Sequence, residues 1–437
     1  MKPPSIWSVR MSFMSKLGNR TCQSLPRIVL AGVVSLVFAN PGTALGEDWS
    51  GIRENYDQLK RYMAAKRRIG ADEKASLVEL QNRIDTYRES NPEDPRPLAM
   101  DIQISTWLGD DARIDRDYEQ LARISDLDRI QVAWAKHRLG LNGYGSIPGI
   151  LRDNPVDLAA EPEAGTLLAR SLMARNQFQE AIDAINAIPE EGLMKPGIRV
   201  SANRIRSQAE RWLPLWQDEV TLREAEDAAG SAPIMQLITS RGPVTVMLYE
   251  TQAPNTVANF IELAERNFFD GTRFHRVEPN FVVQGGDPNS RPDSTIAPGS
   301  GGRGKWIPDE AGRPDKRFHF AGSLAMAKSP DQQQPGSTIP NSASSQFYVV
   351  LEPAENLNDE YTVFGRVIDG IEIVEAIRKN DDLFKVATIS RPEREYKAET
   401  LNIPGVPEAG TKIPSPDIEP ATGDAGGQNS EPDPSGG

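Results

Sequence analysis

Cysteine and histidine, the side chains that most often bind zinc, are scarce in this sequence. The 437 residues include one cysteine, Cys22, and three histidines, His137, His275 and His319. A structural zinc site needs a cluster of such ligands at close spacing, and the sequence contains no Cys/His cluster of this kind. The sequence therefore implies neither a metal nor a cofactor.

Positive charge is also in deficit. Lys and Arg number 49 against 62 Asp and Glu, which gives a formal net charge of −13 and a pI near 5.0. A protein that binds nucleic acid presents a basic face to the phosphates, so this balance argues against nucleic acid as the main partner. Hydrophobic residues make up 38% of the chain, which is enough to form cores, and the length suggests about two or three domains.

The apolar run near the N-terminus, residues 28–39, is shorter than the roughly 20 residues that a membrane-spanning helix needs. Basic residues precede this run and a small-residue pattern, 44–46, follows it, as in secretory signal peptides. We expect residues 1–46 to be a signal peptide cleaved before Glu47, which leaves a periplasmic or secreted protein with no integral membrane span. The alternative is an uncleaved signal that anchors the protein in the membrane.

The region 47–228 is predicted to be all helical, because apolar residues recur at helical spacing between Gly and Pro breaks. The clearest pair of helices lies within 164–188 and is joined by a turn at 175–177. This pair resembles one tetratricopeptide repeat, with the small residues Ala169 and Ala181 where the two helices would cross. The alternative is an irregular helical bundle without a groove.

A composition break rich in Ala and Gly, residues 228–233, is predicted to be a linker, and the hydrophobic period then changes from helical to alternating. Strands are predicted at 234–239 and 244–249, joined as a hairpin. A helix starting at Pro254, several short strands and a second helix follow. This order indicates a closed or nearly closed antiparallel barrel over residues 232–398.

The C-terminal residues 399–437 contain almost no large apolar side chains. They are rich in Pro, Gly, Asp, Glu and Ser. A segment of this composition does not bury enough apolar surface to offset the entropy that it loses on ordering. We therefore predict a disordered tail.

The apolar run 274–287 contains one cation, Arg276, and one amide, Gln284, before it ends at two glycines. The two residues are an even number of positions apart, so they would share one face of a single alternating strand. A face that is apolar and carries two hydrogen-bond donors suits an uncharged polar ligand such as a peptide carbonyl.

Seven sequence blocks occur in a characteristic order. They are Ala253–Phe260, Phe274–Val277, Phe281–Asp287, Ile307–Glu310, Gly322–Ala327, Ser345–Tyr348 and Val363–Val367. Together they resemble the cyclophilin-type peptidyl-prolyl cis-trans isomerases over roughly residues 232–397. The resemblance implies an eight-stranded antiparallel β-barrel capped by two helices, placed after the helical domain.

Rotation about an X–Pro amide has a barrier of roughly 18–20 kcal/mol, because the nitrogen lone pair is conjugated with the carbonyl. A catalyst must stabilise the twisted amide, in which the nitrogen regains its lone pair. The resemblance implies that Arg276 donates a hydrogen bond to this nitrogen, that Gln284 binds the substrate backbone, and that Phe281 forms a wall of the proline pocket. It places Val282, Tyr348 and Leu357 in the same pocket and Ala327, Lys328, Gln346, Asn356 and Tyr361 along the neighbouring groove.

The sequence departs from the family pattern at several of these positions. Tyr348 stands where phenylalanine is common, so the pocket floor gains a hydroxyl that needs a partner. Val282 replaces a longer methionine, and Asn356 replaces Trp or Phe. The loop from Ser329 to Ala343 is longer than in compact members, and it is either a gate for the groove or a tolerated insertion.

The histidines are assigned no catalytic role, because the isomerisation requires no proton transfer. His275 is expected to be a structural imidazole, and His319 and His137 are expected to be packing or surface residues without local partners. The sequence predicts a peptidyl-prolyl isomerase that acts on X–Pro bonds of exported, unfolded or partly folded polypeptides and assists their folding. The helical domain is expected to hold these clients or a partner protein. The alternative is a non-catalytic chaperone or scaffold that binds proline-containing segments and partner proteins.

Overall fold

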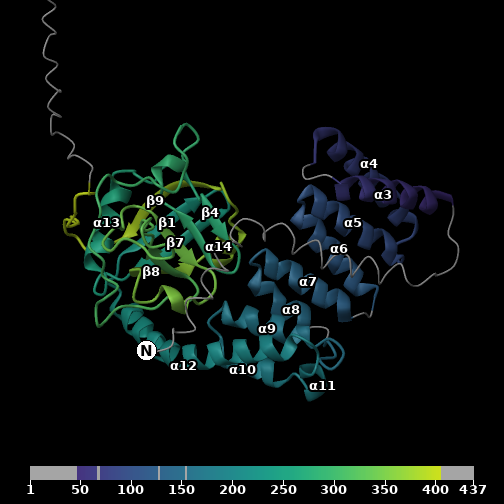
Figure 1. Ribbon diagram of the computed structural model, residues 1–437, viewed down its shortest axis with the longest axis horizontal. Coiled ribbons are helices and arrows are strands. Elements are labelled where there is room, and N and C mark those ends of the chain that lie inside the picture. Colours follow the sequence, from purple (N-terminus) through teal and green to yellow (C-terminus); the bar gives the residue numbers. More distant parts are fainter. Residues whose placement is uncertain (1–46, 66–68, 126–127, 153–154, 405–437) are drawn as a thin grey trace, which may run out of the picture.

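The computed structural model of the protein describes residues 47–65, 69–125, 128–152 and 155–404. A helical region comes first and an antiparallel sheet domain follows it (Figure 1). This order agrees with the predicted division of the chain. The predicted signal peptide, 1–46, lies outside the described residues.

The helical region consists of consecutive helices joined by short turns. The helices are α3 (Glu47–Ala65), α4 (Ala71–Ser90), α5 (Pro95–Leu108), α6 (Asp111–Arg123), α7 (Asp128–Gly140), η1 (Tyr144–Ser146), α8 (Ile147–Arg152), α9 (Glu163–Met173), α10 (Phe178–Asn186), α11 (Glu190–Leu193) and α12 (Ile198–Ala229). Local capping explains their ends: Asp94 accepts a hydrogen bond from the Arg96 amide at the start of α5, and Gly109 ends this helix in the left-handed conformation. None of the helices within the described ranges combines the length and hydropathy needed to cross a membrane.

The helix pair that the sequence placed within 164–188 is present as α9 and α10. Asn176 adopts a left-handed conformation (φ 58°) in the turn between them, and both Ala169 and Ala181 are fully buried. The structure therefore confirms a helical hairpin at this place. Its likeness to a tetratricopeptide repeat stays a prediction.

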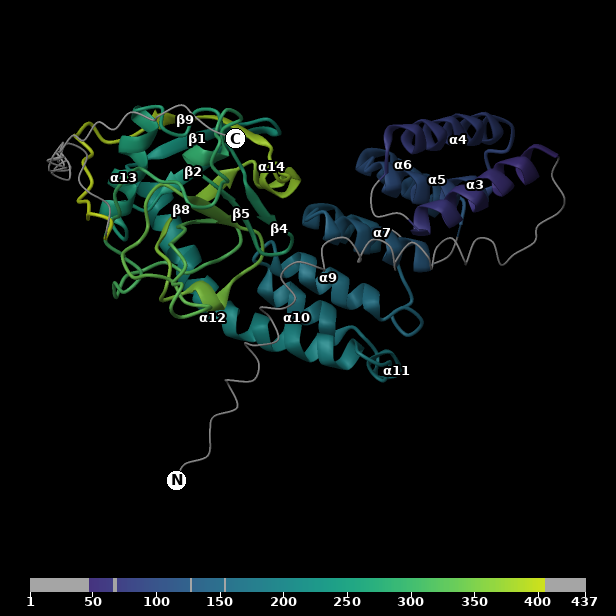
Figure 2. The same cartoon turned by 45° about the horizontal axis from the view of Figure 1, so that its top comes forward.

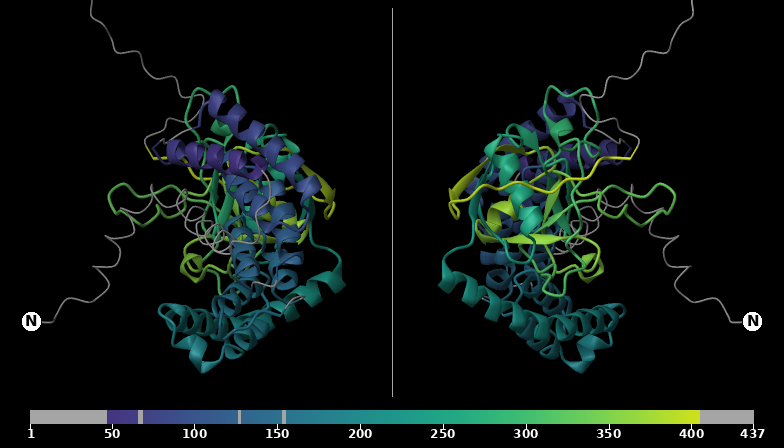
Figure 3. Two further views of the ribbon diagram at one scale, coloured as in Figure 1. Left: turned by 90° about the vertical axis from the view of Figure 1, so that its right-hand side faces the viewer. Right: turned by 90° about the vertical axis from the view of Figure 1, so that its left-hand side faces the viewer.

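The helices fall into two groups, which we call the outer helices (α3–α6) and the inner helices (α7–α12). The outer helices bury their apolar side chains in clusters made of helical residues, such as Trp49, Leu77 and Met100. The inner helices share apolar clusters with the sheet domain, and Phe320 of that domain packs among them. Figures 1 and 2 show the outer helices at one end of the molecule, and Figure 3 shows α9–α12 in teal beneath the sheet domain.

The sheet domain contains one antiparallel sheet with the strand order β3-β9-β1-β2-β8-β6-β7-β5-β4. The strands are β1 (Ile234–Thr239), β2 (Gly242–Leu248), β3 (Thr272–Arg273), β4 (Arg276–Glu278), β5 (Val282–Gly285), β6 (Ser323–Met326), β7 (Phe347–Val350), β8 (Val363–Asp369) and β9 (Asp382–Ser390). Two α-helices accompany them, α13 (Pro254–Glu265) and α14 (Ile371–Ala376), together with the short helices η2 (Pro288–Ser290) and η3 (Glu355–Leu357).

The expected eight-stranded closed barrel is not confirmed, because the sheet has nine strands and no ladder in the described part of the chain joins its end strands, β3 and β4. These two strands are consecutive and are separated only by Phe274 and His275. The backbone of Phe274 bonds instead to the turn before β9: its N–H donates to the Asp381 carbonyl and its carbonyl accepts from the Asn380 amide. This side connection divides one strand into two.

The two ends of the sheet domain compare differently with the predicted boundaries. At the N-terminal end, α12 includes only the first two residues of the predicted linker, to Ala229, and Gly230 ends it in the left-handed conformation. At the C-terminal end, the Leu401 backbone forms a bridge with Trp306, and the Glu399 amide donates to Asn255. Residues 399–404 therefore belong with the domain rather than with the tail, and the tail from 405 onward lies outside the described residues.

Candidate active site

The β4–β5 hairpin brings Arg276 and Gln284 together. Its register places them directly opposite each other, with a tight turn between the strands in which Asn280 is left-handed (φ 60°). The sequence predicted one alternating strand, and this is wrong. The two side chains share a face because they are cross-strand partners. The turn that pairs the strands requires a left-handed residue, and asparagine tolerates this conformation.

The guanidinium of Arg276 is open to solvent, with its side chain 43% exposed. It makes two long contacts, 3.4 Å from Nη1 to Gln284 Oε1 and 3.6 Å from Nε to Glu278 Oε1. The centroid of the Phe281 ring lies 6.0 Å from it. An arginine carries five N–H donors, so this arrangement leaves donors available to a ligand above the hairpin.

A chain of hydrogen bonds fixes the Gln284 amide. Gln346 donates from Nε2 to the buried carboxylate of Asp287 (3.1 Å) and to the Gly301 carbonyl (2.9 Å). Its Oε1 is thereby turned toward Gln284, which donates to it over 2.9 Å. The Oε1 atom of Gln284 consequently faces Arg276. A buried carboxylate therefore sets the orientation of both amides beside the arginine.

An apolar cluster, which we call the pocket cluster, adjoins the arginine through Phe281. Its buried members are Tyr249, Val282, Ala325, Tyr348, Val350, Ala354, Leu357 and Val363, and Phe281, Ala327 and Tyr361 pack against them. The structure thus brings most of the predicted pocket and groove residues into one cluster. Asn356 is exposed in η3, beside the buried Leu357.

Lys328 lines the groove as a paired cation. Its Nζ donates to Asp309 Oδ2 (2.7 Å) and to the Glu360 carbonyl (3.2 Å), and its side chain is only 5% exposed. The long loop beside it is held to the same turn, since the Thr338 hydroxyl donates to Glu360 Oε1 over 2.6 Å. The groove wall on this side is therefore tied together by polar contacts.

The hydroxyl of Tyr348 has a partner that the sequence analysis missed. His319 is fully buried, and its Nε2 lies 3.0 Å from this hydroxyl. The prediction that His319 has no local partner is wrong, because a loop before β6 brings it beneath β7. The sequence did indicate that the Tyr348 hydroxyl needs a hydrogen-bond partner. Spacing along the chain did not identify His319 as that partner.

The turn after α7 and the short helix η1 contact the tip of the β4–β5 hairpin. The Asn280 amide N–H donates to Asn142 Oδ1 over 2.9 Å. With its side-chain amide oriented to donate, Asn280 also reaches the Tyr144 hydroxyl (3.2 Å) and Glu352 Oε1 (3.3 Å), and Glu352 pairs with Arg170 of α9 (2.8 Å). Sequence reasoning gave no sign of these contacts; the bond between Asn142 and Asn280, for example, joins residues 138 positions apart.

The other two histidines, His275 and His137, lie outside the pocket cluster. Burial lowers the pKa of His275, so this imidazole is neutral at pH 7. His137 lies in α7, outside the pocket cluster. Within the described ranges, no group of three or more His, Cys, Asp or Glu side chains is placed to hold a metal ion.

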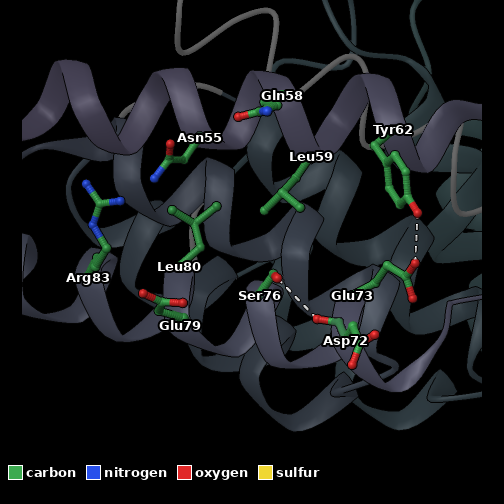
Figure 4. Close-up of a pocket in the computed structure, with 10 residues that line it drawn as sticks. All are labelled: Asn55, Gln58, Leu59, Tyr62, Asp72, Glu73, Ser76, Glu79, Leu80 and Arg83. Atoms are coloured by element: carbon green, nitrogen blue, oxygen red, sulfur yellow. Dashed lines mark hydrogen bonds between the residues drawn. The ribbon is translucent and has the colours of Figure 1, made fainter.

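A cavity lies between α3 and α4 and has a volume of about 460 Å³ (Figure 4). Leu59 and Leu80 contribute apolar surface, and the charged residues of its lining are Asp72, Glu73, Glu79 and Arg83. The Tyr62 hydroxyl donates to Glu73 Oε1 over 3.0 Å at one end. This cavity belongs to the outer helices and contains none of the predicted isomerase residues.

Comparison with known proteins matches the sheet domain to one family. The model of the family described as cyclophilin type peptidyl-prolyl cis-trans isomerase/CLD matches residues 234–400. Peptidyl-prolyl cis-trans isomerase-like 1 of Mus musculus is 40% identical over 145 residues, 33% of this chain and 79% of that protein. A peptidyl-prolyl cis-trans isomerase of Synechococcus elongatus is 34% identical over 156 residues, 35% of this chain and 94% of that protein.

A solved cyclophilin-type isomerase from Cryptosporidium parvum, crystallised in the presence of the dipeptide Ala-Pro, is 27% identical, with a TM-score of 0.31. The match covers 36% of this chain and 99% of that one. On the identity and coverage of the curated relatives, the chain belongs to the cyclophilin family. It is a cyclophilin-type peptidyl-prolyl cis-trans isomerase.

Proposed function

We propose that this isomerase acts on X–Pro bonds of exported polypeptides that are unfolded or partly folded, and that it assists their folding. The observation that carries the isomerase part is the position of Arg276: its exposed guanidinium lies opposite Gln284 at the edge of an apolar pocket. Export rests on the signal-like composition of residues 1–46.

In the proposed mechanism the proline ring enters the pocket formed by Phe281, Val282, Tyr348 and Leu357. These apolar surfaces exclude water from the amide. Gln284 hydrogen-bonds the substrate backbone and so fixes one side of the X–Pro bond. As the amide twists, Arg276 donates an N–H to the proline nitrogen, whose lone pair is then free to accept it. No bond is made or broken, and no proton is transferred.

For the helical region we propose a role in holding clients or a partner protein close to the isomerase. The inner helices are occupied by the sheet domain, so the outer helices and their cavity are the surface that would receive such a segment. A segment held there would raise the local concentration of X–Pro bonds at the pocket. We propose separately that α9 and α10 form one tetratricopeptide-like repeat.

The second candidate function is a chaperone or scaffold that binds proline-containing segments without significant turnover. The polar floor at Tyr348 and the exposed Asn356 favour it, because both differ from the apolar and aromatic residues of the family. The position of Arg276 favours the enzyme.

Substitution of Arg276 by alanine separates these two functions. We expect the wild type to accelerate cis-to-trans isomerisation of a proline-containing peptide, and Arg276→Ala to lower kcat/KM at least about tenfold, or about 1.4 kcal/mol of barrier. Arg273→Ala is the matched control, since Arg273 is the last residue of β3, lies three positions before Arg276 and pairs with Asp382 (2.8 Å). Equal rates for wild type and Arg276→Ala would exclude the proposed mechanism.

Processing and location have a separate test. Mass spectrometry of the mature protein should give an N-terminus at or near Glu47 in the periplasmic or secreted fraction. A mature chain that still carries residues 28–39 and sediments with membranes would favour the anchored alternative.

A further inference from the structure

All the polar groups of His319 are directed at the wall of the proline pocket opposite Arg276. Its backbone N–H and its Nδ1 both contact Asn358 Oδ1, at 3.0 and 2.9 Å. Its Nε2 contacts the Tyr348 hydroxyl at 3.0 Å, and its carbonyl accepts from the Ala354 amide at 3.0 Å. One buried residue therefore joins β7, which carries Tyr348, to the turn that carries Leu357.

The hydrogen bonds determine which nitrogen of the His319 ring carries the proton. Asn358 Oδ1 is an acceptor, so Nδ1 carries the imidazole proton and Nε2 accepts from the Tyr348 hydroxyl. Burial lowers the pKa of His319 to about 4 and raises the pKa of Tyr348 well above its usual value. Both groups are neutral at pH 7, and the hydroxyl has one fixed acceptor.

The hydrogen bond to His319 fixes the position of the Tyr348 ring, which forms the floor of the pocket. The Tyr348 ring packs edge-on against Tyr361, with ring centroids 6.0 Å apart and an interplanar angle of 79°. It lies in the same apolar cluster as Val282 and Leu357. A tyrosine whose buried hydroxyl lacked an acceptor would have to turn that group toward water or toward the substrate.

The segment 317–321, which contains His319, is held from the other side by the inner helices. Arg317 pairs with Glu219 of α12 through two contacts of 2.7 and 2.8 Å, and both side chains are almost fully buried. Asn176, in the turn between α9 and α10, exchanges two hydrogen bonds of 3.0 Å with the backbone of Ala321. The helical region thus fixes the segment on both sides of the histidine.

Phe320 completes this attachment. Its ring centroid lies 5.0 Å from those of both Trp212 and Trp216, and its exposure is 0%. Because its neighbours are buried in the helical region, His319 has little freedom to follow a displaced Tyr348.

We propose that His319 is a positioning residue for the isomerase reaction. It acts through the Tyr348 hydroxyl to hold the proline pocket in its binding shape, and the inner helices hold His319 itself in place. The proposal rests on the isomerase activity. It gives the helical region a part in the site itself, in addition to any client or partner that this region binds.

A double-mutant cycle tests the proposal. His319→Leu should lower kcat/KM about five- to tenfold, because it leaves the Tyr348 hydroxyl without its acceptor. Tyr348→Phe gives the other side of the cycle, because it removes the group that needs an acceptor, and its own kcat/KM is the reference for the double variant. In the Tyr348→Phe background, His319→Leu should then change kcat/KM by no more than about twofold.

His137→Leu is the matched control, because it replaces a partly buried histidine outside the pocket and should leave kcat/KM unchanged. If His319→Leu alone fails to fold, the double variant is compared with Tyr348→Phe. Equal activity of these two supports the proposal, and a loss of five-fold or more in the double variant overturns it. Activity of the wild type is measured first, so that an absent isomerase activity is told apart from an absent role of His319.

Discussion

The outer and inner helices each contain a buried carboxylate between two arginines, but they use it differently. Asp101 is bound by Arg88 (3.3 Å) and Arg113 (2.6 Å), all within α4–α6 and the turns between them. Glu219 is bound by Arg223 of the same helix (2.7 Å) and by Arg317 of the sheet domain (2.7 Å). The first network links the outer helices only to one another, whereas the second links α12 to the sheet domain.

This difference shows where the functional unit begins. The change in composition at 228–233 marks a change of secondary structure, but the apolar clusters and ion pairs continue across it. The inner helices are part of the isomerase body. The outer helices share one apolar cluster with α7, through Ile130 and Ala133, but none of their described residues belongs to the pocket cluster.

The largest expected effect comes from removing one carboxylate of each network. Glu219→Ala leaves Arg317 buried with Glu226 as its remaining carboxylate partner and should lower the unfolding free energy by up to about 3–5 kcal/mol. It should also reduce kcat/KM, because Arg317 and His319 belong to the same segment. Asp101→Ala is the matched variant and should destabilise the outer helices while leaving kcat/KM unchanged. Denaturant unfolding and peptide isomerisation below the transition provide the two measurements.

The comparison would fail if both variants lost isomerase activity to the same extent at equal folded fractions. The inner and outer helices would then support the pocket equally, and the boundary proposed between α6 and α7 would have no functional meaning.

A smaller effect is expected from the pH dependence of His319. Burial holds its folded pKa at about 4, below the value of about 6.5 in the unfolded chain. Its contribution to stability is therefore present above the unfolded pKa and is lost as the pH falls from about 6.5 to 4, because only the unfolded state takes up the proton.

Between about pH 7 and pH 4.5, the wild type should lose on the order of 2 kcal/mol more unfolding free energy than the His319→Leu, Tyr348→Phe double variant. His137 and His275 are present in both proteins, so their titration cancels in the difference. If the unfolding free energies of the two proteins changed with pH in parallel, His319 would not be a neutral, buried residue in the folded protein.

The smallest effect concerns an exposed pair in the same interface. Arg211 of α12 contacts Glu355 at 3.0 Å, but both side chains are more than half exposed. Water screens such a pair, so Arg211→Ala should change the unfolding free energy by less than about 1 kcal/mol. Thermal or denaturant unfolding measures this directly. A loss as large as that of Glu219→Ala would show that burial is not what distinguishes the strong contacts of α12.

Local chemistry made part of this architecture predictable from the sequence. The α9–α10 hairpin follows from apolar periodicity around a turn that needs one left-handed residue, Asn176. The meeting of Arg276 and Gln284 was predicted from their even spacing, although a hairpin rather than one strand produces it. In both cases the residues that determine the structure lie within about 25 positions of one another, where periodicity is informative.

The features that were missed depend on contacts between distant parts of the chain. Nothing near His319 identifies Tyr348 as its partner, and nothing near Arg317 identifies Glu219, which lies 98 positions away. The break between β3 and β4 depends on the turn at Asn380 and Asp381. Such pairings follow from the packing of whole elements, which local propensity and spacing do not encode.

The placement of Phe320 has a consequence for how the chain is made. Its aromatic neighbours Phe178, Trp212 and Trp216 are synthesised at least roughly 100 residues earlier, because translation proceeds from the N-terminus. The aromatic core of the inner helices is therefore completed only after much of the sheet domain has been synthesised.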